Sequence, residues 1–287
     1  MIRIAILLFV LCLTVCNSKE HSGTEADTTI CENSELNAKA VLIDLFKINP
    51  LQNDCELHDN SGDGYGKRCK EFHIHRKISQ QELAVSGLNK FSPTSDTAFT
   101  RVLFINFISN SKDSVLVLLE SILPNLNCPP CSPFIGAAVY YRKNHGWANL
   151  FYQSYVVNSG SFGIATSLPK IEQIGKNNYG LVFTWNATGQ GYSESGIRIF
   201  INLNNCFQEV FSITTAADNS GLCTDSLPKR WSWSSSYSFS VEDNKEWHDL
   251  TINTDGTKAD SSCIIPVHKI EKYFFNGHKY IANVQEK

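Results

Sequence analysis

The sequence predicts a mainly β protein, built as an antiparallel sandwich or a barrel-like sheet, with a small helical N-terminal portion. Short strand-like apolar runs recur every ten to fifteen residues or so from about residue 98 onward. Turn-rich segments containing Asn and Gly separate these runs, and residues 231–241 alternate aromatic side chains with serines. This cadence is typical of antiparallel sheets, and it is also compatible with a short propeller.

The composition indicates a folded protein that does not bind nucleic acid. The chain has 287 residues, of which 42% are hydrophobic and 18% are charged, and its formal net charge is −3. The 17 Phe, 10 Tyr and 5 Trp supply enough apolar surface for a core, so the chain as a whole is not disordered. No long run of like charges occurs, and a basic surface for nucleic acid is therefore not expected.

The beginning of the chain has the features of an export signal. Arg3 precedes an uncharged apolar run from Ile4 to Val15, which is too short to span a bilayer as a helix. Residues 1–16 are therefore predicted to be a signal peptide. Residues 17–33 are polar and aperiodic, and we expect them to form a flexible tether.

Two outcomes of this export remain open. Cleavage near Asn17 leaves a periplasmic protein in a bacterium and a secreted protein elsewhere. Alternatively, Leu13-Thr14-Val15-Cys16 resembles the lipid-attachment box of bacterial lipoproteins. That resemblance implies lipidation of Cys16 and an outer-membrane anchor, which would be the protein's only contact with a membrane.

Residues 34–95 are predicted to form a helical and loop-rich N-terminal portion. Apolar residues recur at helical spacing across 34–47, and a helix there ends before Pro50. Ser79 and Glu82 have the spacing of a capping box ahead of a second apolar run. A short helix is therefore expected to follow Ser79.

The remaining residues, 96–287, are predicted to form the antiparallel β domain. Strand-like runs occupy 99–108, 115–119, 137–142, 147–157, 181–185, 197–203 and 231–241, and a further strand begins near Leu250. Residues 186–191 are expected to form a turn-rich connection. The clearest hairpin is at Asn276-Gly277, because these residues accept the positive φ angles of a tight turn.

The cysteines predict a disulfide framework. Ten cysteines, less Cys12 and Cys16 of the export segment, leave eight, which in an oxidising compartment predicts four disulfides. The eight are Cys31, Cys55, Cys69, Cys128, Cys131, Cys206, Cys223 and Cys263. Proximity along the chain favours the pairs 55–69, 128–131 and 206–223 and leaves 31–263, but eight cysteines allow about 105 pairings.

The Cys128-Pro129-Pro130-Cys131 segment resembles the active-site motif of thioredoxin-like oxidoreductases, particularly their tryparedoxin-like branch. In that family the motif opens a helix whose N-terminus lowers the pKa of the first thiol. Here Asn127 stands where a Trp is usual, and a strand-like run follows instead of a helix. This context favours a structural disulfide, and thiol–disulfide exchange is the alternative.

Two segments carry candidate metal ligands. Glu71, His73 and His75 alternate, so on a strand they share one face and could bind a transition metal such as zinc. The same pattern fits the polar face of an exposed strand, with the intervening apolar residues pointing inward. Asp59 and Asp63 lie in a segment that resembles the first half of a calcium loop, although its closing glutamate is one position late. No cofactor is required, and calcium or zinc is the alternative.

A further set of candidates consists of aromatic side chains at strand spacing. Trp231, Trp233 and Tyr237 share one face of a predicted strand and could stack against sugar rings. The same stripe is typical of the inner face of a sheet, where aromatic side chains bury large areas. Nearby, residues 243–250 are similar to the VCBS and FG-GAP repeats, which implies an acidic loop followed by Asp249-Leu250 at the start of a strand. The alternative is a polar turn before a strand.

As a whole the chain resembles exported β-rich envelope proteins and lipoproteins of bacteria. We expect a non-catalytic binding protein, such as an inhibitor, an immunity-type partner or an adhesion module. Its partner would be another protein or a glycan. The alternative is an envelope enzyme, either a thiol–disulfide exchanger using Cys128 and Cys131 or a metal-assisted hydrolase using His73 and His75.

Overall fold

The computed structural model describes residues 36–51, 72–87, 96–108, 112–123, 132–144, 146–160, 168–222, 230–241, 245–260 and 263–283. It confirms the mainly antiparallel β fold, because these residues form two antiparallel sheets and only two α-helices. The predicted signal peptide, the tether and the CPPC motif lie outside the described residues. Within the described ranges, no helix is long and apolar enough to cross a membrane.

The first sheet has five strands in the order of the sequence. They are β1 (His73–Lys77), β2 (Thr97–Phe107), β3 (Ser114–Ile122), β4 (Phe134–Lys143) and β5 (Gly146–Asn158). Each strand pairs antiparallel with the next one along the chain. Because β1 precedes residue 96, the N-terminal portion supplies an edge strand of this sheet as well as helices.

The second sheet has eight strands, again in the order of the sequence. They are β6 (Lys170–Gln173), β7 (Tyr179–Gly189), β8 (Tyr192–Asn202), β9 (Phe207–Asp218), β10 (Ser232–Phe239), β11 (Leu250–Asp260), β12 (Cys263–Phe275) and β13 (Tyr280–Ala282). A short 3-10 helix, η2 (Ser220–Leu222), follows β9. The described strands are therefore two continuous sheets rather than separate blades, and the propeller alternative was wrong.

One turn of the second sheet is shorter than predicted, and another lies where it was predicted. The predicted turn-rich connection at 186–191 was too long, since β7 runs to Gly189 and β8 begins at Tyr192. Gln190 and Gly191 alone form the turn, with φ angles of 51° and 80°. The predicted Asn276-Gly277 turn is confirmed, with Gly277 at a φ of 93° between β12 and β13.

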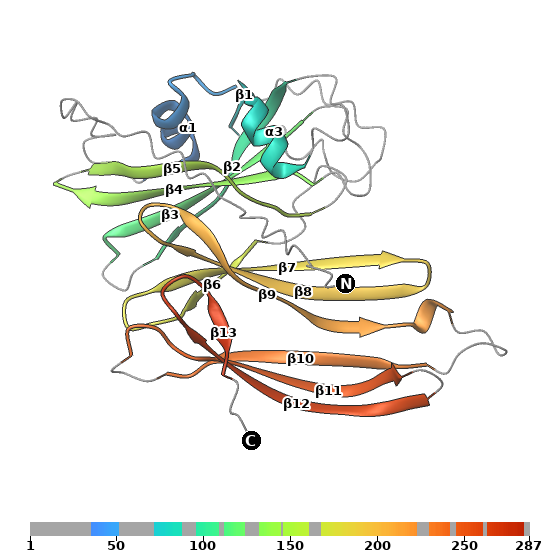
Figure 1. The fold of residues 1–287 in the computed structure, drawn as a ribbon. Helices are drawn as coiled ribbons and strands as arrows, with labels where there is room; N and C mark the ends of the chain where they lie inside the picture. Colours follow the sequence, from blue (N-terminus) through green and yellow to red (C-terminus); the bar gives the residue numbers. More distant parts are fainter. Residues whose placement is uncertain are drawn as a thin grey trace, which may run out of the picture.

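Both predicted helices are confirmed. Helix α1 (Ala38–Phe46) begins after Asn37, whose side-chain oxygen accepts a hydrogen bond from the backbone N–H of Ala40 at 3.0 Å. Helix α3 (Gln80–Ser86) begins with the complete Ser79–Glu82 capping box. Both helices lie on the first sheet, on the side away from the second sheet (Figure 1).

Three layers of apolar side chains hold these elements together. The side chains of β3 alternate between two of them: Leu116 and Leu118 face the second sheet, whereas Val117 and Leu119 pack with α1. Strand β3 is thus buried on both faces, which explains its uninterrupted apolar sequence. The core between the sheets also contains Phe183 and Phe200 from β7 and β8.

The second sheet folds back on itself. Strands β10–β12 lie beneath β7–β9 in Figure 1, and a third core of residues such as Ile199, Phe211 and Leu250 fills the space between the two halves. The ladder between the halves is short, since β9 and β10 pair only at Ser232, Trp233 and Ser234. By contrast, β11 and β12 pair along their whole length. We call the β9–β10 junction the seam.

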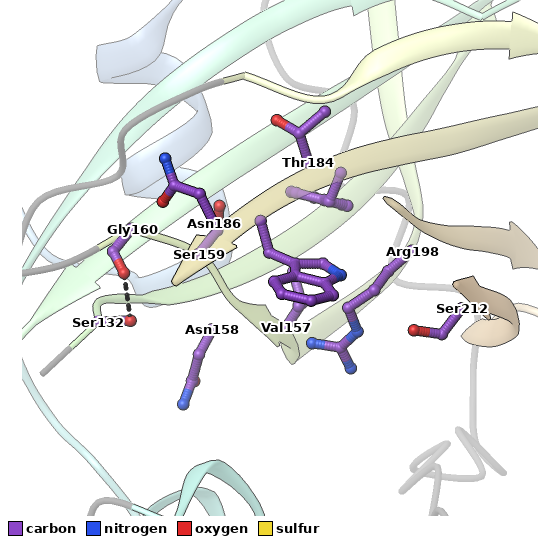
Figure 2. A pocket seen from close by; sticks show the side chains of 11 residues that line it. Ser132, Val157, Asn158, Ser159, Gly160, Thr184, Asn186, Arg198 and Ser212 are labelled. Carbon is purple, nitrogen blue, oxygen red and sulfur yellow. Dashed lines mark hydrogen bonds between the residues drawn. The ribbon is translucent and has the colours of Figure 1, made fainter. Parts of the chain in front are cut away.

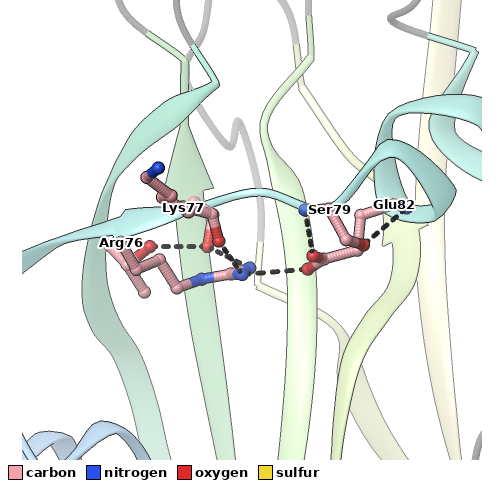
Figure 3. Close-up of polar contacts among 6 residues, drawn as sticks. Arg76, Lys77, Ser79 and Glu82 are labelled. Carbon is pink, nitrogen blue, oxygen red and sulfur yellow. Dashed lines mark hydrogen bonds and ion pairs between the residues drawn. The ribbon is translucent and has the colours of Figure 1, made fainter.

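A buried polar network fixes α3 to the first sheet (Figure 3). The Arg76 guanidinium donates to Glu82 at 2.9 Å and to the Ser121 hydroxyl at 3.2 Å, and Ser121 in turn pairs with Thr100 at 2.8 Å. Burial opposes ionisation of Glu82, but the Arg76 charge and hydrogen bonds from Ser79 lower the pKa of this carboxyl below its ordinary value. Glu82 therefore serves both as a helix cap and as the partner of a buried cation.

Candidate functional site

The first candidate site is a pocket of about 390 Å³ between the end of β5 and the facing strands β7–β9 (Figure 2). Strand β5 and the residues after it contribute one wall, and the second sheet contributes the other. Its polar lining consists of Ser132, Asn158, Ser159, Thr184, Asn186 and Ser212. A pocket of this size lies within the range of about 300–1,000 Å³ that small-molecule sites occupy. We call it the inter-sheet pocket.

The aromatic wall of the inter-sheet pocket is set by a glycine. Trp185 lines the pocket from β7, and Gly196 is its direct partner on β8. A Cβ atom at position 196 would overlap the Cε2 and Cζ2 atoms of the Trp185 indole. The absence of a side chain at Gly196 therefore leaves the space against β8 that the indole occupies.

The positive charge in the lining of the inter-sheet pocket is paired with a carboxylate outside it. Among the described residues that line the pocket, Arg198 alone is ionic, and its guanidinium pairs with Glu209 on β9 through both Nε, at 2.7 Å, and Nη2. Arg198 and Glu209 are each about one-third exposed, so this pair contributes little to stability. It does neutralise the positive charge beside the pocket.

Two residues that line this pocket each have a buried polar side-chain atom without a hydrogen-bond partner. These atoms are the Oδ1 atom of Asn158 and the hydroxyl of Ser159, which is only 6% exposed. The Asn158 amide is held in place because its Nδ2 donates to the carbonyl of Ser86 at 2.7 Å. Both atoms are enclosed by protein, so they do not face the free space of the pocket.

The second candidate site is a more open groove of about 640 Å³ that follows the seam. Residues 216–218 of β9 and 232–234 of β10 line it, and these are the residues that form the short β9–β10 ladder. Trp233 contributes an aromatic residue, and Glu194, Asp218 and Asp255 contribute carboxylates. Small hydroxyl side chains fill most of the remaining lining. We call this site the seam groove.

Local interactions hold two of the seam-groove carboxylates, Asp218 and Asp255, in place. Hydrogen bonds from the hydroxyl and the N–H of Ser220 lower the pKa of Asp218, which is partly exposed to solvent. Asp255 contacts the His268 ring at 2.6 Å on β12. Gly256, at a φ of 136°, lets β10 and β11 approach closely, since a Cβ there would overlap the backbone of β10. The groove therefore has three acidic residues in its lining, and β10 and β11 lie close together along one of its walls.

The three residues of the predicted aromatic stripe, Trp231, Trp233 and Tyr237, lie in different parts of the structure. Trp233 lines the seam groove, whereas Trp231 lies just before β10 and contacts the Tyr192 ring, with centroids 6.4 Å apart. Tyr237 packs against the core between the halves of the second sheet and donates to Glu172 at 3.2 Å. The geometry thus associates Trp233 with a cavity and Tyr237 with the core. The ligand-binding role of the stripe stays a prediction.

The predicted metal ligands are only partly described. His73 and His75 lie on β1 with ring centroids 5.8 Å apart, but His73 is fully buried and stacks on Phe99 at 4.5 Å. Its burial differs from the expected exposed polar face, although Ile74 does point inward. In the described ranges, no group of three or more His, Cys, Asp or Glu residues could hold a metal ion. Glu71, Asp59 and Asp63 lie outside these ranges, so the zinc and calcium sites stay predictions.

The cysteine framework is likewise described in part. Cys206 is buried before β9 and is disulfide-bonded. Cys263 is exposed at the start of β12. The remaining six predicted disulfide cysteines, and Cys16, lie outside the described residues, so their pairing and lipidation stay predictions.

The inter-sheet pocket could not be found by sequence reasoning. Ser132, Asn158, Trp185 and Arg198 are distant in the sequence and match no motif, and they meet only because the two sheets stack. The sequence offers one local signal, a glycine in a predicted strand at position 196. Its pairing with Trp185, whose indole occupies the space of the absent side chain, is evident only in the structure.

Comparison of the chain with family models, curated proteins and solved structures finds no match. The functional argument therefore depends on the geometry of the inter-sheet pocket and the seam groove.

Proposed function

We propose that the protein is an exported, disulfide-stabilised, non-catalytic binding protein of the cell envelope that recognises a glycan in the seam groove. The observation that supports this proposal most directly is the groove itself. The groove has a volume of about 640 Å³ and is open to solvent. Its lining combines an aromatic residue, Trp233, with carboxylates and hydroxyls. The predicted signal peptide and the disulfide at Cys206 support the exported, oxidising compartment.

The chemistry of the groove favours a glycan over other polar partners. The carboxyl oxygens of Glu194, Asp218 and Asp255 can each accept hydrogen bonds from sugar hydroxyls, and the serines and threonine that line the groove can donate or accept. An indole can cover the C–H face of a sugar ring. Three carboxylates repel phosphate, so nucleic acids and other polyanions are disfavoured.

The test measures binding of the purified mature protein to a panel of neutral and acidic glycans, by tryptophan fluorescence and calorimetry. We expect neutral glycans to bind, and Trp233→Ala to weaken binding by about tenfold or more, the scale of a central aromatic contact. The matched control is Phe274→Ala, which removes an aromatic side chain that is 40% exposed on β12, outside the groove.

Three results would overturn parts of the proposal. Failure of every glycan to bind, or equal binding by the Trp233→Ala variant, removes the seam groove as the site. Capture of one dominant envelope protein by crosslinking would replace the glycan with a protein partner. Hydrolysis of a bound glycan would overturn the non-catalytic role. N-terminal mass analysis of protein from its native source tests export, because cleavage near Asn17 and lipidated Cys16 give different masses.

A further inference from the structure

We propose that Asn186 is a site of N-linked glycosylation, modified on the export route by transfer of an oligosaccharide from a lipid-linked donor. Asn186-Ala187-Thr188 is the one Asn-x-Ser/Thr triplet in the 287 residues of the chain. This triplet, with any residue but proline in the middle, is the acceptor sequence for that modification in exported proteins. The modification does not depend on the proposed function, whereas its effect on the seam groove does.

The acceptor triplet lies in the exposed half of its strand. Strand β7 is buried from Gly180 to Phe183, but Asn186, Ala187 and Thr188 are all exposed. Because successive side chains of a strand point to opposite faces, three exposed residues in a row mean that neither face is covered there. A glycan attached to Asn186 therefore displaces no buried side chain.

The edge of β7 is also open at the triplet. Strand β6 pairs with β7 at 179–182, whereas β8 pairs with it as far as Gly189. Within the described part of the chain, residues 183–189 are therefore an edge strand, which ends at the two-residue turn Gln190-Gly191. An exposed edge can pair with another chain, and a bulky, solvated glycan at Asn186 would block such pairing.

The transfer is a substitution at C1 of the first sugar. Nδ2 of Asn186 forms the new bond to C1 and loses one proton to a base of the transferring enzyme. The bond between C1 and the phosphate oxygen of the donor breaks, and the lipid pyrophosphate leaves with the electron pair. The export compartment must supply the donor and the enzyme, and the predicted signal peptide and the disulfide at Cys206 support passage through an oxidising compartment.

A glycan on Asn186 would begin where the two cavities meet. Asn186 lines both the inter-sheet pocket and the seam groove, and Figure 2 shows its side chain among those of the pocket. A short tether holds the first sugars at an effective concentration in the millimolar range, so they compete with added glycans for the seam groove. For an added glycan of millimolar affinity, the glycosylated protein should bind about twofold or more weakly than the same sequence made without the modification.

The test is a peptide map of protein from its native source, before and after digestion with a peptide N-glycosidase. We expect the tryptic peptide 177–198 to carry a glycan, and the enzyme to release it and convert Asn186 to Asp. In a host that glycosylates the proteins it secretes, Asn186→Gln and Thr188→Ala should lose the glycan. The matched control is Thr188→Ser, which keeps the acceptor triplet and should keep the glycan. Because both positions are exposed, all three variants should fold and be secreted.

The possible results separate this inference from the proposed function. An unmodified Asn186 in protein from the native source overturns the inference, and so does a glycan that persists in Thr188→Ala. Both results leave glycan binding in the seam groove untouched, because the glycan panel is measured on unmodified protein as well. A modified Asn186 without binding of any added glycan would support the inference and overturn the proposed function. Equal affinity of the modified and unmodified forms would overturn the competition for the groove.

Discussion

The Arg76–Glu82 ion pair allows a quantitative test of how the first sheet holds α3. The variant Glu82→Gln removes the charge, but a glutamine can still complete the capping box with Ser79. The two charged groups are 2.9 Å apart and both side chains are about nine-tenths buried. Their gross attraction is about 6 kcal/mol at an effective dielectric constant near 20, and desolvation offsets most of it. We expect a net loss of about 1–2 kcal/mol in the free energy of unfolding at pH 7.

The pH dependence identifies the charge as the cause. Because folding lowers the pKa of Glu82, its contribution to stability is complete above the ordinary value of 4.5 and is lost as the pH falls through the folded-state pKa. Urea denaturation of wild type and variant at pH 7 and about pH 3 should therefore show a difference that shrinks in acid. Glu246→Gln, at an exposed position, is the control and should change stability little at either pH. An undiminished difference at the acidic pH would refute the ion-pair explanation.

Other features make simpler predictions. Leu118→Ala, in the core between the sheets, should lower the free energy of unfolding by about 2–5 kcal/mol, whereas Val241→Ala, 80% exposed, should change it by less than about 0.5 kcal/mol in the same denaturant titration. Gly256→Ala should cost about 1–3 kcal/mol because of its positive φ, and a melting temperature equal to the wild type's would contradict this. Peptide mapping without reduction should recover Cys206 linked to Cys223, and any other linkage would overturn pairing by proximity.

Much of the fold could be predicted because local chemistry and tertiary structure agree. The apolar run at 115–119 became β3, and the Ser79–Glu82 spacing became the start of α3. The β7–β8 turn was misjudged because residues 186–189 are polar, although they pair in the ladder as far as Gly189. Exposed strand ends tolerate polar residues, so composition alone overestimated the length of the turn.

The candidate sites were predicted less well, for a physical reason. Trp233 could be singled out because it belongs to a stripe with strand periodicity, which is a local property. Asn158 and Arg198 could not, because their position depends on how the sheets stack and on which polar atoms the stacking leaves without partners. A sequence shows which side chains can form hydrogen bonds, but it does not show which of them will be left unpaired.

The seam also has a consequence for how the molecule opens. The β9–β10 ladder has three residue pairs, and hydrogen bonds such as Tyr237–Glu172 and His248–Ile174 also join the halves. Strands β10–β13 can therefore separate from β6–β9 only when these contacts break together with the third core. Amide hydrogens at 216–218 and 232–234 should therefore exchange with solvent sooner than those of the long β11–β12 ladder. Since the same residues line the seam groove, a molecule bound there bridges the two halves. Because such a molecule binds only when the two halves are together, it would slow this exchange. Binding in the seam groove would therefore also stabilise the second sheet against opening.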